Sequence, residues 1–309
     1  MATYNESLVL YAAGADSYDA RGFHMGHVPA TASRPKPALG EMRRVRANGI
    51  ELNVLVAGQG PDVLLVHGFP DWHEVWRHQI PVLVEAGYRV IAPDTRGCGD
   101  SEISPRVADY RVENLVADLI ALLEVLGVPK VKLVAHDWGA VIGWQLAIRH
   151  PGRVERFIAL SVGHPAAYAG FDLMQRLRGW YTLFFQLRGI AECVCRCCDW
   201  DVFRRLIRYD AEFPHWRERL SRPGRLTAGL NYYRANLHLL AAHWHPQAVT
   251  VPVHGVWSSR DKFLTEKQML ESQRYVRAVW SYTRMDGPNH WLQLDAPERF
   301  NPLLLDSLR

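Results

Sequence analysis

Residues Val131–Ala140 read VKLVAHDWGA, and they are the most informative segment about the fold class. Its first half is a short, mainly apolar run, which is typical of a strand buried in a parallel sheet. A helix is predicted to begin near Gly139. The turn between them has the pattern small–x–acid–x–small, with Ala135 and Gly139 as the small residues and Asp137 in the middle. Such a tight strand-to-helix turn exposes a nucleophile above a sheet.

The middle residue of this turn is an aspartate, and that choice restricts the chemistry. A carboxylate is a poor nucleophile toward acyl carbon, but it displaces a leaving group from sp³ carbon and forms an alkyl ester that water must then hydrolyse. Asp137 therefore points to epoxides or alkyl halides as substrates. The alternative is an aspartate that only caps the following helix.

Strand-like and helical segments alternate on both sides of this turn. Asn48-Gly49 separates two short strand-like runs and predicts a hairpin. The predicted strands are Met42–Arg46, Ile50–Val56, Asp62–Val66, Tyr88–Ile91, Val131–Ala135, Phe157–Ser161, Val251–Trp257 and Ser281–Met285. The predicted core helices are Trp76–Ala86, Val112–Leu126 and Ala140–Arg149. This alternation predicts an α/β fold with a doubly wound, mostly parallel sheet.

The pattern divides the chain into three parts. Residues 1–40 are rich in Ala, Gly, Ser and Pro, which indicates an irregular N-terminal extension. Residues 41–164 and 247–309 are predicted to form the sheet core. Residues 165–246 are helical and aromatic in character, so we expect an inserted helical cap, or lid.

A histidine and a second carboxylate follow predicted strands at the positions that an activated nucleophile requires. Asp261 comes after the strand Val251–Trp257, and His290 comes after the last strand. Both lie at carboxyl ends of strands, where open α/β sheets place their sites. The order nucleophile, acid, histidine is the order of a triad in this kind of fold, with His290 activating water and Asp261 orienting it. The backbone N–H groups of Phe69 and Trp138 are the expected oxyanion hole.

Three motifs carry a resemblance to a known family. They are His67-Gly68-Phe69-Pro70, Arg96-Gly97-Cys98-Gly99-Asp100-Ser101 and His136-Asp137-Trp138-Gly139. With them, the chain resembles the epoxide hydrolase branch of the α/β-hydrolase superfamily from about residue 42 to residue 309. Two departures occur: Asp71 stands where Glu is frequent, and Ala135 replaces the first glycine of the turn.

The resemblance implies a pair of cap tyrosines that hydrogen-bond the epoxide oxygen and protonate the alkoxide. Tyr233, within Asn231-Tyr232-Tyr233-Arg234, and Tyr181 match the family's positions, with Tyr168 and Tyr232 as fallback assignments. The resemblance thus implies conversion of an epoxide to a vicinal diol. The substrate pocket is expected to be apolar and to include Trp138, His67, Pro70, Phe185 and Trp291.

The nearest alternative is a haloalkane dehalogenase, which would use Asp137, Asp261 and His290 in the same way. A halide needs two N–H donors, and the Trp138 indole can supply one of them. The second donor often comes from the position of Phe69, which has no side-chain N–H in this chain. The cap tyrosines also favour an oxygen leaving group over a halide.

Composition excludes several other classes of protein. The chain has 309 residues, 48% hydrophobic, with a net charge of +4 and no dense basic run, so we expect no nucleic-acid partner. No apolar run approaches the roughly 18 residues of a membrane span. The N-terminal apolar stretch has no preceding basic residue, which predicts a cytoplasmic protein. The expected partner is a small epoxide, and the chain is expected to be a monomer or a homodimer.

Five cysteines are present, and four of them crowd into residues 193–198. Their spacing matches no common zinc site and no histidine lies near, so we expect no metal. The favoured interpretation is that they are small apolar side chains of a helix. No phosphate-binding glycine motif occurs, and no cofactor is expected.

Overall fold

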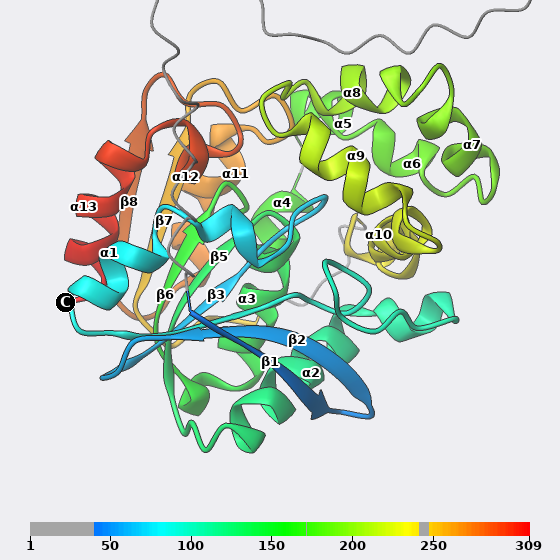
Figure 1. The fold of residues 1–309 in the computed structure, drawn as a ribbon. Coiled ribbons are helices and arrows are strands. Elements are labelled where there is room, and N and C mark those ends of the chain that lie inside the picture. Colours follow the sequence, from blue (N-terminus) through cyan, green and yellow to red (C-terminus); the bar gives the residue numbers. More distant parts are fainter. Residues whose placement is uncertain (1–39, 171, 241–246) are drawn as a thin grey trace, which may run out of the picture. The chain divides into compact units, whose positions relative to one another are not determined.

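A computed structural model describes residues 40–170, 172–240 and 247–309, and these residues contain an eight-stranded sheet (Figure 1). The strand order is β1-β2-β4-β3-β5-β6-β7-β8. The strands are β1 (Glu41–Ala47), β2 (Ile50–Ala57), β3 (Asp62–Val66), β4 (Arg89–Pro93), β5 (Val131–His136), β6 (Val154–Leu160), β7 (Val253–Ser258) and β8 (Trp280–Met285). All neighbours from β4 to β8 pair in parallel, and β2 pairs antiparallel with β1 and β4. The predicted α/β fold with a mostly parallel sheet is confirmed. The predicted extension, apart from Gly40, lies outside the described residues.

The first hairpin follows from its turn residues. Asn48 and Gly49 have φ angles of 47° and 80°, the left-handed conformation that a two-residue hairpin turn requires. Ala47 pairs with Ile50 across this turn. The hairpin predicted from Asn48-Gly49 is therefore present, with β1 and β2 as its two strands.

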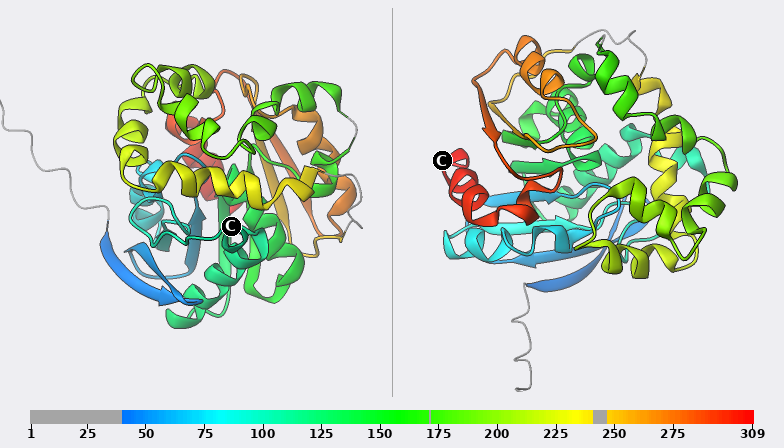
Figure 2. Two further views of the ribbon diagram at one scale, coloured as in Figure 1. Left: turned by 90° about the vertical axis from the view of Figure 1, so that its right-hand side faces the viewer. Right: turned by 90° about the horizontal axis from the view of Figure 1, so that it is seen from above.

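Helices cover both faces of the sheet because its central strands are apolar on both sides (Figure 2). Leu64 and Leu133 belong to one buried cluster, whereas their neighbours Val63 and Val134 belong to another, as the alternation of side chains along a strand requires. The first cluster includes residues of α2 (Val112–Val125) and α3 (Trp138–Arg149). The second includes residues of α1 (Ile80–Glu85) and α13 (Pro297–Ser307).

The helix predicted over Trp76–Ala86 begins later than expected. Residues His73–Trp76 form a separate 3₁₀ turn, η1, and α1 begins at Ile80. Pro81 lies in the first turn of α1, where its missing N–H costs no hydrogen bond. The apolar periodicity of the sequence runs through both η1 and α1, which is why it predicted one longer helix. Pro81 is compatible only with the first turn of an α-helix, so α1 begins at Ile80.

The remaining short core elements connect strands and helices. They are η2 (Val107–Tyr110), η3 (Pro151–Arg153), α11 (Glu266–Glu271), η5 (Ser272–Tyr275) and α12 (Leu292–Asp295).

A run of short helices separates β6 from β7, and we call it the helical insertion (described residues 165–170 and 172–240). Its members are α4 (Pro165–Tyr168), α5 (Leu173–Arg178), α6 (Tyr181–Phe184), α7 (Ile190–Arg196), α8 (Asp201–Ile207), α9 (Phe213–Ser221), α10 (Arg225–Ala235) and η4 (Leu237–Leu240). Figure 1 shows α5 to α10 grouped together at one end of the sheet. Residues 171 and 241–246 of the expected cap lie outside the described residues. Among the described helices, none has the length and apolar character to cross a membrane.

Candidate active site

The turn after β5 holds Asp137 in a strained backbone conformation. Its φ of 52° and ψ of −122° are unusual for a residue with a side chain, and α3 begins at the next residue. Gly139 is required here because a Cβ would collide with the carbonyl oxygens of Val66 and His67 at the end of β3. The two strand ends approach each other closely, and the Asp137 side chain is held at the carboxyl edge of the sheet.

His290 lies between two carboxylates. Its Nδ1 is 2.8 Å from Oδ2 of Asp261, and its Nε2 is 3.4 Å from Oδ2 of Asp137. Asp261 is itself fixed by two backbone N–H groups, from Phe263 and Leu264, that donate to its other oxygen at 2.8 and 2.9 Å. The three residues that the sequence predicted as a triad therefore meet, although they come from three separate loops.

The charges of this group determine its resting protonation. Burial alone would lower the pKa of His290, but the adjacent charges of Asp261 and Asp137 outweigh burial and raise that pKa to about 10. Burial would raise the pKa of Asp137, but the hydrogen bond and charge of His290 lower it. At neutral pH the resting site therefore contains an Asp137 carboxylate, the form that acts as a nucleophile.

One oxygen of Asp137 accepts a hydrogen bond from the backbone of the loop after β3. The Phe69 N–H donates to Asp137 Oδ1 at 2.9 Å. Gly68 permits this approach, because a Cβ there would overlap the Asp137 side chain. The Trp138 N–H is at the start of α3 and has no acceptor within the helix. The Phe69 N–H is therefore a backbone donor at the Asp137 carboxyl group, and the Trp138 N–H belongs to the next residue of the chain.

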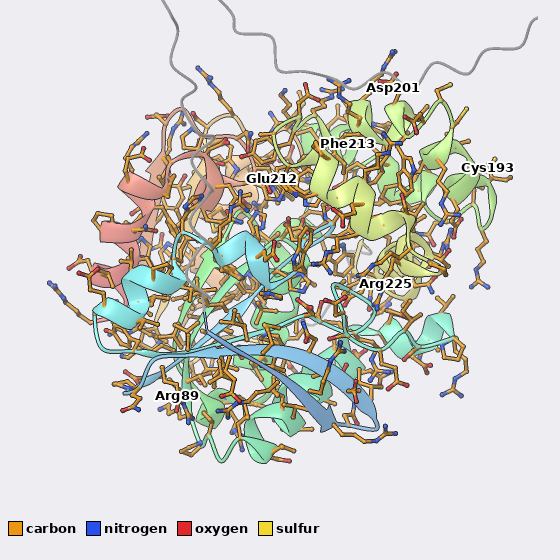
Figure 3. All side chains as sticks on the ribbon, viewed as in Figure 1. Arg89, Cys193, Asp201, Glu212, Phe213 and Arg225 are labelled. Atoms are coloured by element: carbon orange, nitrogen blue, oxygen red, sulfur yellow. The ribbon has the colours of Figure 1, made fainter. Side chains whose placement is uncertain are left out.

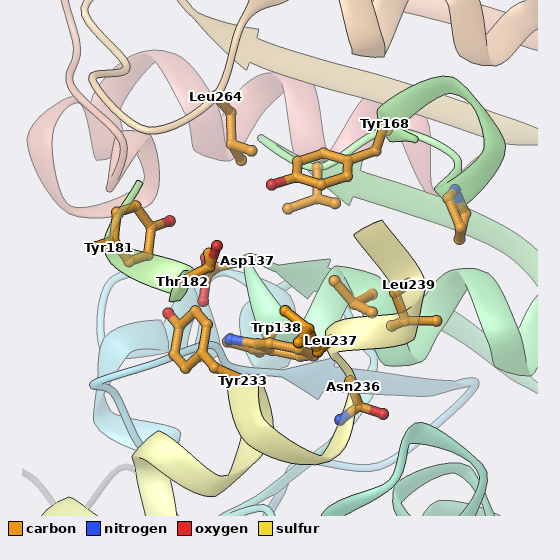
Figure 4. Close-up of a pocket in the computed structure, with 14 residues that line it drawn as sticks. Asp137, Trp138, Tyr168, Tyr181, Thr182, Tyr233, Asn236, Leu237, Leu239 and Leu264 are labelled. Carbon is orange, nitrogen blue, oxygen red and sulfur yellow. The ribbon is translucent and has the colours of Figure 1, made fainter. Parts of the chain in front are cut away.

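Two cavities meet at Asp137. The larger lobe contains about 710 Å³ of empty space and the smaller lobe about 310 Å³. Asp137, Tyr181 and Tyr233 line both lobes. The larger lobe is otherwise mostly apolar, with Trp138 on its wall (Figure 4), and the smaller lobe includes Phe69, Phe185, His290 and Trp291. Asp137 is thus reached from a pocket suited to apolar groups.

Tyr181 and Tyr233 face Asp137 from the helical insertion. They lie on α6 and α10, and Figure 4 shows both hydroxyl groups directed toward Asp137. Their rings are 5.9 Å apart at an angle of 78°, and Phe185 packs against both. Burial, together with nearby negative charge, raises the pKa of each phenol well above its usual value. Both phenols are therefore protonated at neutral pH and can donate hydrogen bonds.

The two fallback tyrosines differ in position. The Tyr232 hydroxyl donates to Arg96 O at 2.7 Å and lies 2.9 Å from Thr95 Oγ1, so it points into the core rather than into either lobe. Tyr168 does line the larger lobe. Burial raises its pKa to about 12.

Two residues expected at the substrate pocket, His67 and Pro70, line neither lobe. The His67 ring lies beneath the site, where its Nδ1 contacts Gly68 O at 2.8 Å and its Nε2 accepts from the Thr95 N–H at 2.9 Å. Pro70 follows a cis peptide bond after Phe69. Both residues shape the loop that carries the Phe69 amide.

The sequence reasoning missed Phe263, an important part of the wall. Its ring packs edge-on against His290 at 5.1 Å and against Tyr181 at 5.7 Å. It therefore lies between the core and the insertion. Its place two residues after Asp261 is the signal that could have identified it.

A buried link through Asp71 was missed as well. Asp71 accepts hydrogen bonds from two indole N–H groups, Trp216 on α9 at 3.0 Å and Trp291 next to His290 at 2.9 Å. Burial raises the pKa of this carboxyl group to about 7, although the two indoles oppose the rise. The position where the family often has Glu thus joins the insertion to the histidine loop.

Comparison with known proteins agrees with this geometry. Residues 61–191 match the family model of the alpha/beta hydrolase fold. Epoxide hydrolase A of Mycobacterium tuberculosis is 31% identical over 315 residues, which cover 86% of this chain and 96% of that protein. The crystal structure of an epoxide hydrolase from Vigna radiata is similar with a TM-score of 0.77 and 31% identity, covering 87% of this chain and 97% of that one. This chain belongs to the epoxide hydrolases of the α/β-hydrolase superfamily.

Another similar protein carries only a superfamily name. AB hydrolase superfamily protein YfhM of Bacillus subtilis is 34% identical over 278 residues. The matched region covers 86% of this chain and 96% of that protein. Family membership confirms the resemblance drawn from the three motifs. It makes this chain one of a group of hydrolases that act on ether bonds.

Proposed function

We propose that this enzyme hydrolyses an epoxide to a vicinal diol through a covalent ester on Asp137. One observation carries the proposal: a carboxylate at a strained turn, with its side chain 16% exposed, faces two protonated tyrosines across a mainly apolar cavity. The carboxylate supplies the nucleophile, and the phenols supply the acid that an epoxide oxygen needs. The family relationship supports the same reaction.

In the first step Asp137 attacks an epoxide carbon while the ring oxygen lies between Tyr181 and Tyr233. The C–O bond breaks, an ester forms, and the developing alkoxide takes a proton from a tyrosine. An alkoxide is a much stronger base than a phenolate, so proton transfer is favourable even from a phenol whose pKa is raised. The two hydroxyl groups also hold the epoxide oxygen before attack.

In the second step His290 activates a water molecule. Esterification removes the negative charge of Asp137, so the pKa of His290 falls and the imidazolium loses its proton through solvent to the tyrosinate left by the first step. The neutral imidazole is then available as a base. Asp261 keeps Nδ1 protonated and directs Nε2 toward the ester. The amides of Phe69 and Trp138 stabilise the oxyanion of the tetrahedral intermediate, which then collapses to diol and free Asp137.

The unequal lobes favour an epoxide with substituents of different size. An apolar or aromatic group fits the larger lobe, whose wall includes Trp138 and Leu264. The smaller lobe leaves room for a hydrogen or a short alkyl group beside Phe69 and Phe185. Styrene oxide has these features and is the probe of choice.

The test compares styrene oxide with 1,2-dibromoethane as substrates. We expect diol from styrene oxide and no bromide release. Tyr181→Phe and Tyr233→Phe should each lower kcat for the epoxide by about 10²-fold, since acid catalysis is worth roughly 10²–10⁴. Tyr282→Phe is the matched control, because this tyrosine lies on β8 and donates to Glu266.

The opposite result identifies a dehalogenase. The Trp138 indole packs edge-on against the Tyr233 ring with the centroids 5.1 Å apart, and its N–H is a side-chain donor available to a halide in the larger lobe. Bromide release that persists in both tyrosine variants would overturn the proposal. Equal loss of activity in Tyr282→Phe would show that the effect of the other two is not specific.

A further inference from the structure

Two adjacent cysteines, Cys197 and Cys198, lie exposed in the turn between α7 and α8 of the helical insertion. Their sulfur atoms are 3.4 Å apart and contact each other. Contact with the Cys197 sulfur raises the pKa of the Cys198 thiol. The contact makes the two side chains a pair of neighbouring thiols. The expectation of packed apolar cysteines in a helix holds for Cys195, which is buried on α7, but not for the exposed Cys197 and Cys198.

The other three cysteines of the chain are placed differently. Cys98 and Cys195 are removed from ready reaction, because burial raises the pKa of their thiols to about 11 and about 12. Cys193 is exposed at the outer side of α7 (Figure 3). Among the described residues, no group of three or more His, Cys, Asp or Glu side chains is arranged to hold a metal ion. The paired sulfurs are thus suited to thiol chemistry rather than to metal binding.

The backbone of this turn is strained. Cys198, Asp199 and Trp200 follow one another with φ angles of 50°, 56° and 71°, all in the left-handed region. For residues with a side chain this conformation is unfavourable, because the Cβ comes too close to the following carbonyl oxygen. A new covalent bond within the turn therefore acts on a backbone that is already strained.

We propose that Cys197 and Cys198 form a reversible disulfide that lowers the activity of the enzyme. Closing the bond requires the sulfurs to move from 3.4 Å to about 2.05 Å. Adjacent Cα atoms are about 3.8 Å apart, below the usual range of roughly 4.4–6.8 Å for disulfides. The bond is therefore strained and easily reduced, as regulatory disulfides are.

The oxidant is a small disulfide such as oxidised glutathione. One thiolate of the pair attacks the glutathione disulfide, expels one glutathione thiolate and forms a mixed disulfide. The second cysteine attacks the sulfur of that protein cysteine and expels the other glutathione thiolate. The two protons of the cysteine thiols end on the two glutathione thiols, so atoms and electrons balance.

A chain of aromatic contacts joins the dithiol to the candidate active site. Trp200 packs against Phe203 at 6.0 Å, and Phe203 packs against Phe69 at 6.1 Å. The Phe69 N–H is the donor to Asp137. The same helix, α8, also contributes Leu206 and Ile207 to the smaller lobe. A change in the turn therefore acts on the wall that faces the nucleophile, and this part of the inference rests on the proposed function.

The first measurement is the intact mass of the full chain after incubation with oxidised glutathione. We expect a loss of about 2 Da, located by peptide mapping at residues 197–198 and reversed by dithiothreitol. Cys197→Ser and Cys198→Ser should instead retain a bound glutathione, whereas Cys193→Ser should still lose 2 Da, as the unchanged chain does. Persistent glutathione adducts on the unchanged pair, or no reaction there, would overturn the disulfide.

The second measurement is kcat/KM for styrene oxide before and after oxidation. We expect a several-fold decrease in the unchanged chain and in Cys193→Ser, with full recovery on reduction and no decrease in Cys197→Ser or Cys198→Ser. Formation of the disulfide with unchanged kcat/KM would overturn its regulatory role. Absence of epoxide turnover in the reduced enzyme would instead refute the proposed function, while the mass measurement still tests the disulfide.

Discussion

The two halves of the candidate site are held in different ways. In the core, Asp137, Asp261 and His290 are fixed by backbone geometry at strand ends and by hydrogen bonds of 2.8–2.9 Å. In the insertion, Tyr181 and Tyr233 lie on helices that neighbouring aromatic rings hold in place. The core half can therefore position a charge accurately, whereas the insertion half can adapt its shape to the substrate.

The two halves of the candidate site also differ in charge. The core half carries the ionised groups, and burial increases their mutual attraction. The insertion half presents neutral phenols. We infer that the core determines the reaction and the insertion determines which epoxide enters.

The largest expected effect is on kcat, and it distinguishes the core half from the insertion half by the reaction step that each one catalyses. His290→Gln should form the alkyl ester but fail to hydrolyse it, with kcat lower by about 10⁴-fold, as for loss of the base of a triad. The intact mass after mixing with styrene oxide should show the protein plus one substrate. The Tyr181→Phe/Tyr233→Phe double variant should show no accumulated ester, because its defect precedes ester formation. Only free protein in His290→Gln would contradict this division.

A smaller effect concerns the stability of the insertion half. Arg234 follows Tyr233 and makes a bidentate pair with Glu192 at 2.7 and 2.9 Å, with only 3% of the Arg234 side chain exposed. Glu192→Gln leaves this guanidinium buried without its charge partner, and should lower the free energy of unfolding by about 3 kcal/mol. Urea unfolding measures the change. An equal loss in Glu218→Gln, an exposed site on α9, would argue against the pair as the cause.

The smallest effect is a pH dependence that belongs to the core half. The folded pKa of His290, about 10, lies above its unfolded value near 6.5, so its contribution to stability is complete below about 6.5 and is lost as pH rises through 10. We therefore expect the free energy of unfolding of the unchanged chain to fall as pH rises from about 6.5 to about 10. His290→Gln removes this contribution and leaves that of other groups. Parallel curves for the two proteins would refute the assignment.

The sequence was sufficient for the parts that local chemistry determines. The tight turn at Asp137 and the loops carrying Asp261 and His290 follow apolar strands, so their meeting at one edge of the sheet was predictable. The link from Asp71 to Trp216 and Trp291 was not, since it joins residues up to 220 positions apart. Such contacts depend on tertiary packing, which leaves no periodic signal in the sequence.

The positions at which the helical insertion joins the sheet affect how the sequence of this protein can evolve. The chain leaves the sheet after β6 and re-enters at β7, and these two strands are hydrogen-bonded neighbours. The β6–β7 pairing is made directly between these two strands, and a longer or shorter segment between them alters the entropy of chain closure only slowly. A different helical segment can thus be grafted there while the turn that carries Asp137 stays intact. Divergence in substrate choice among related genes is expected to concentrate in this single contiguous stretch.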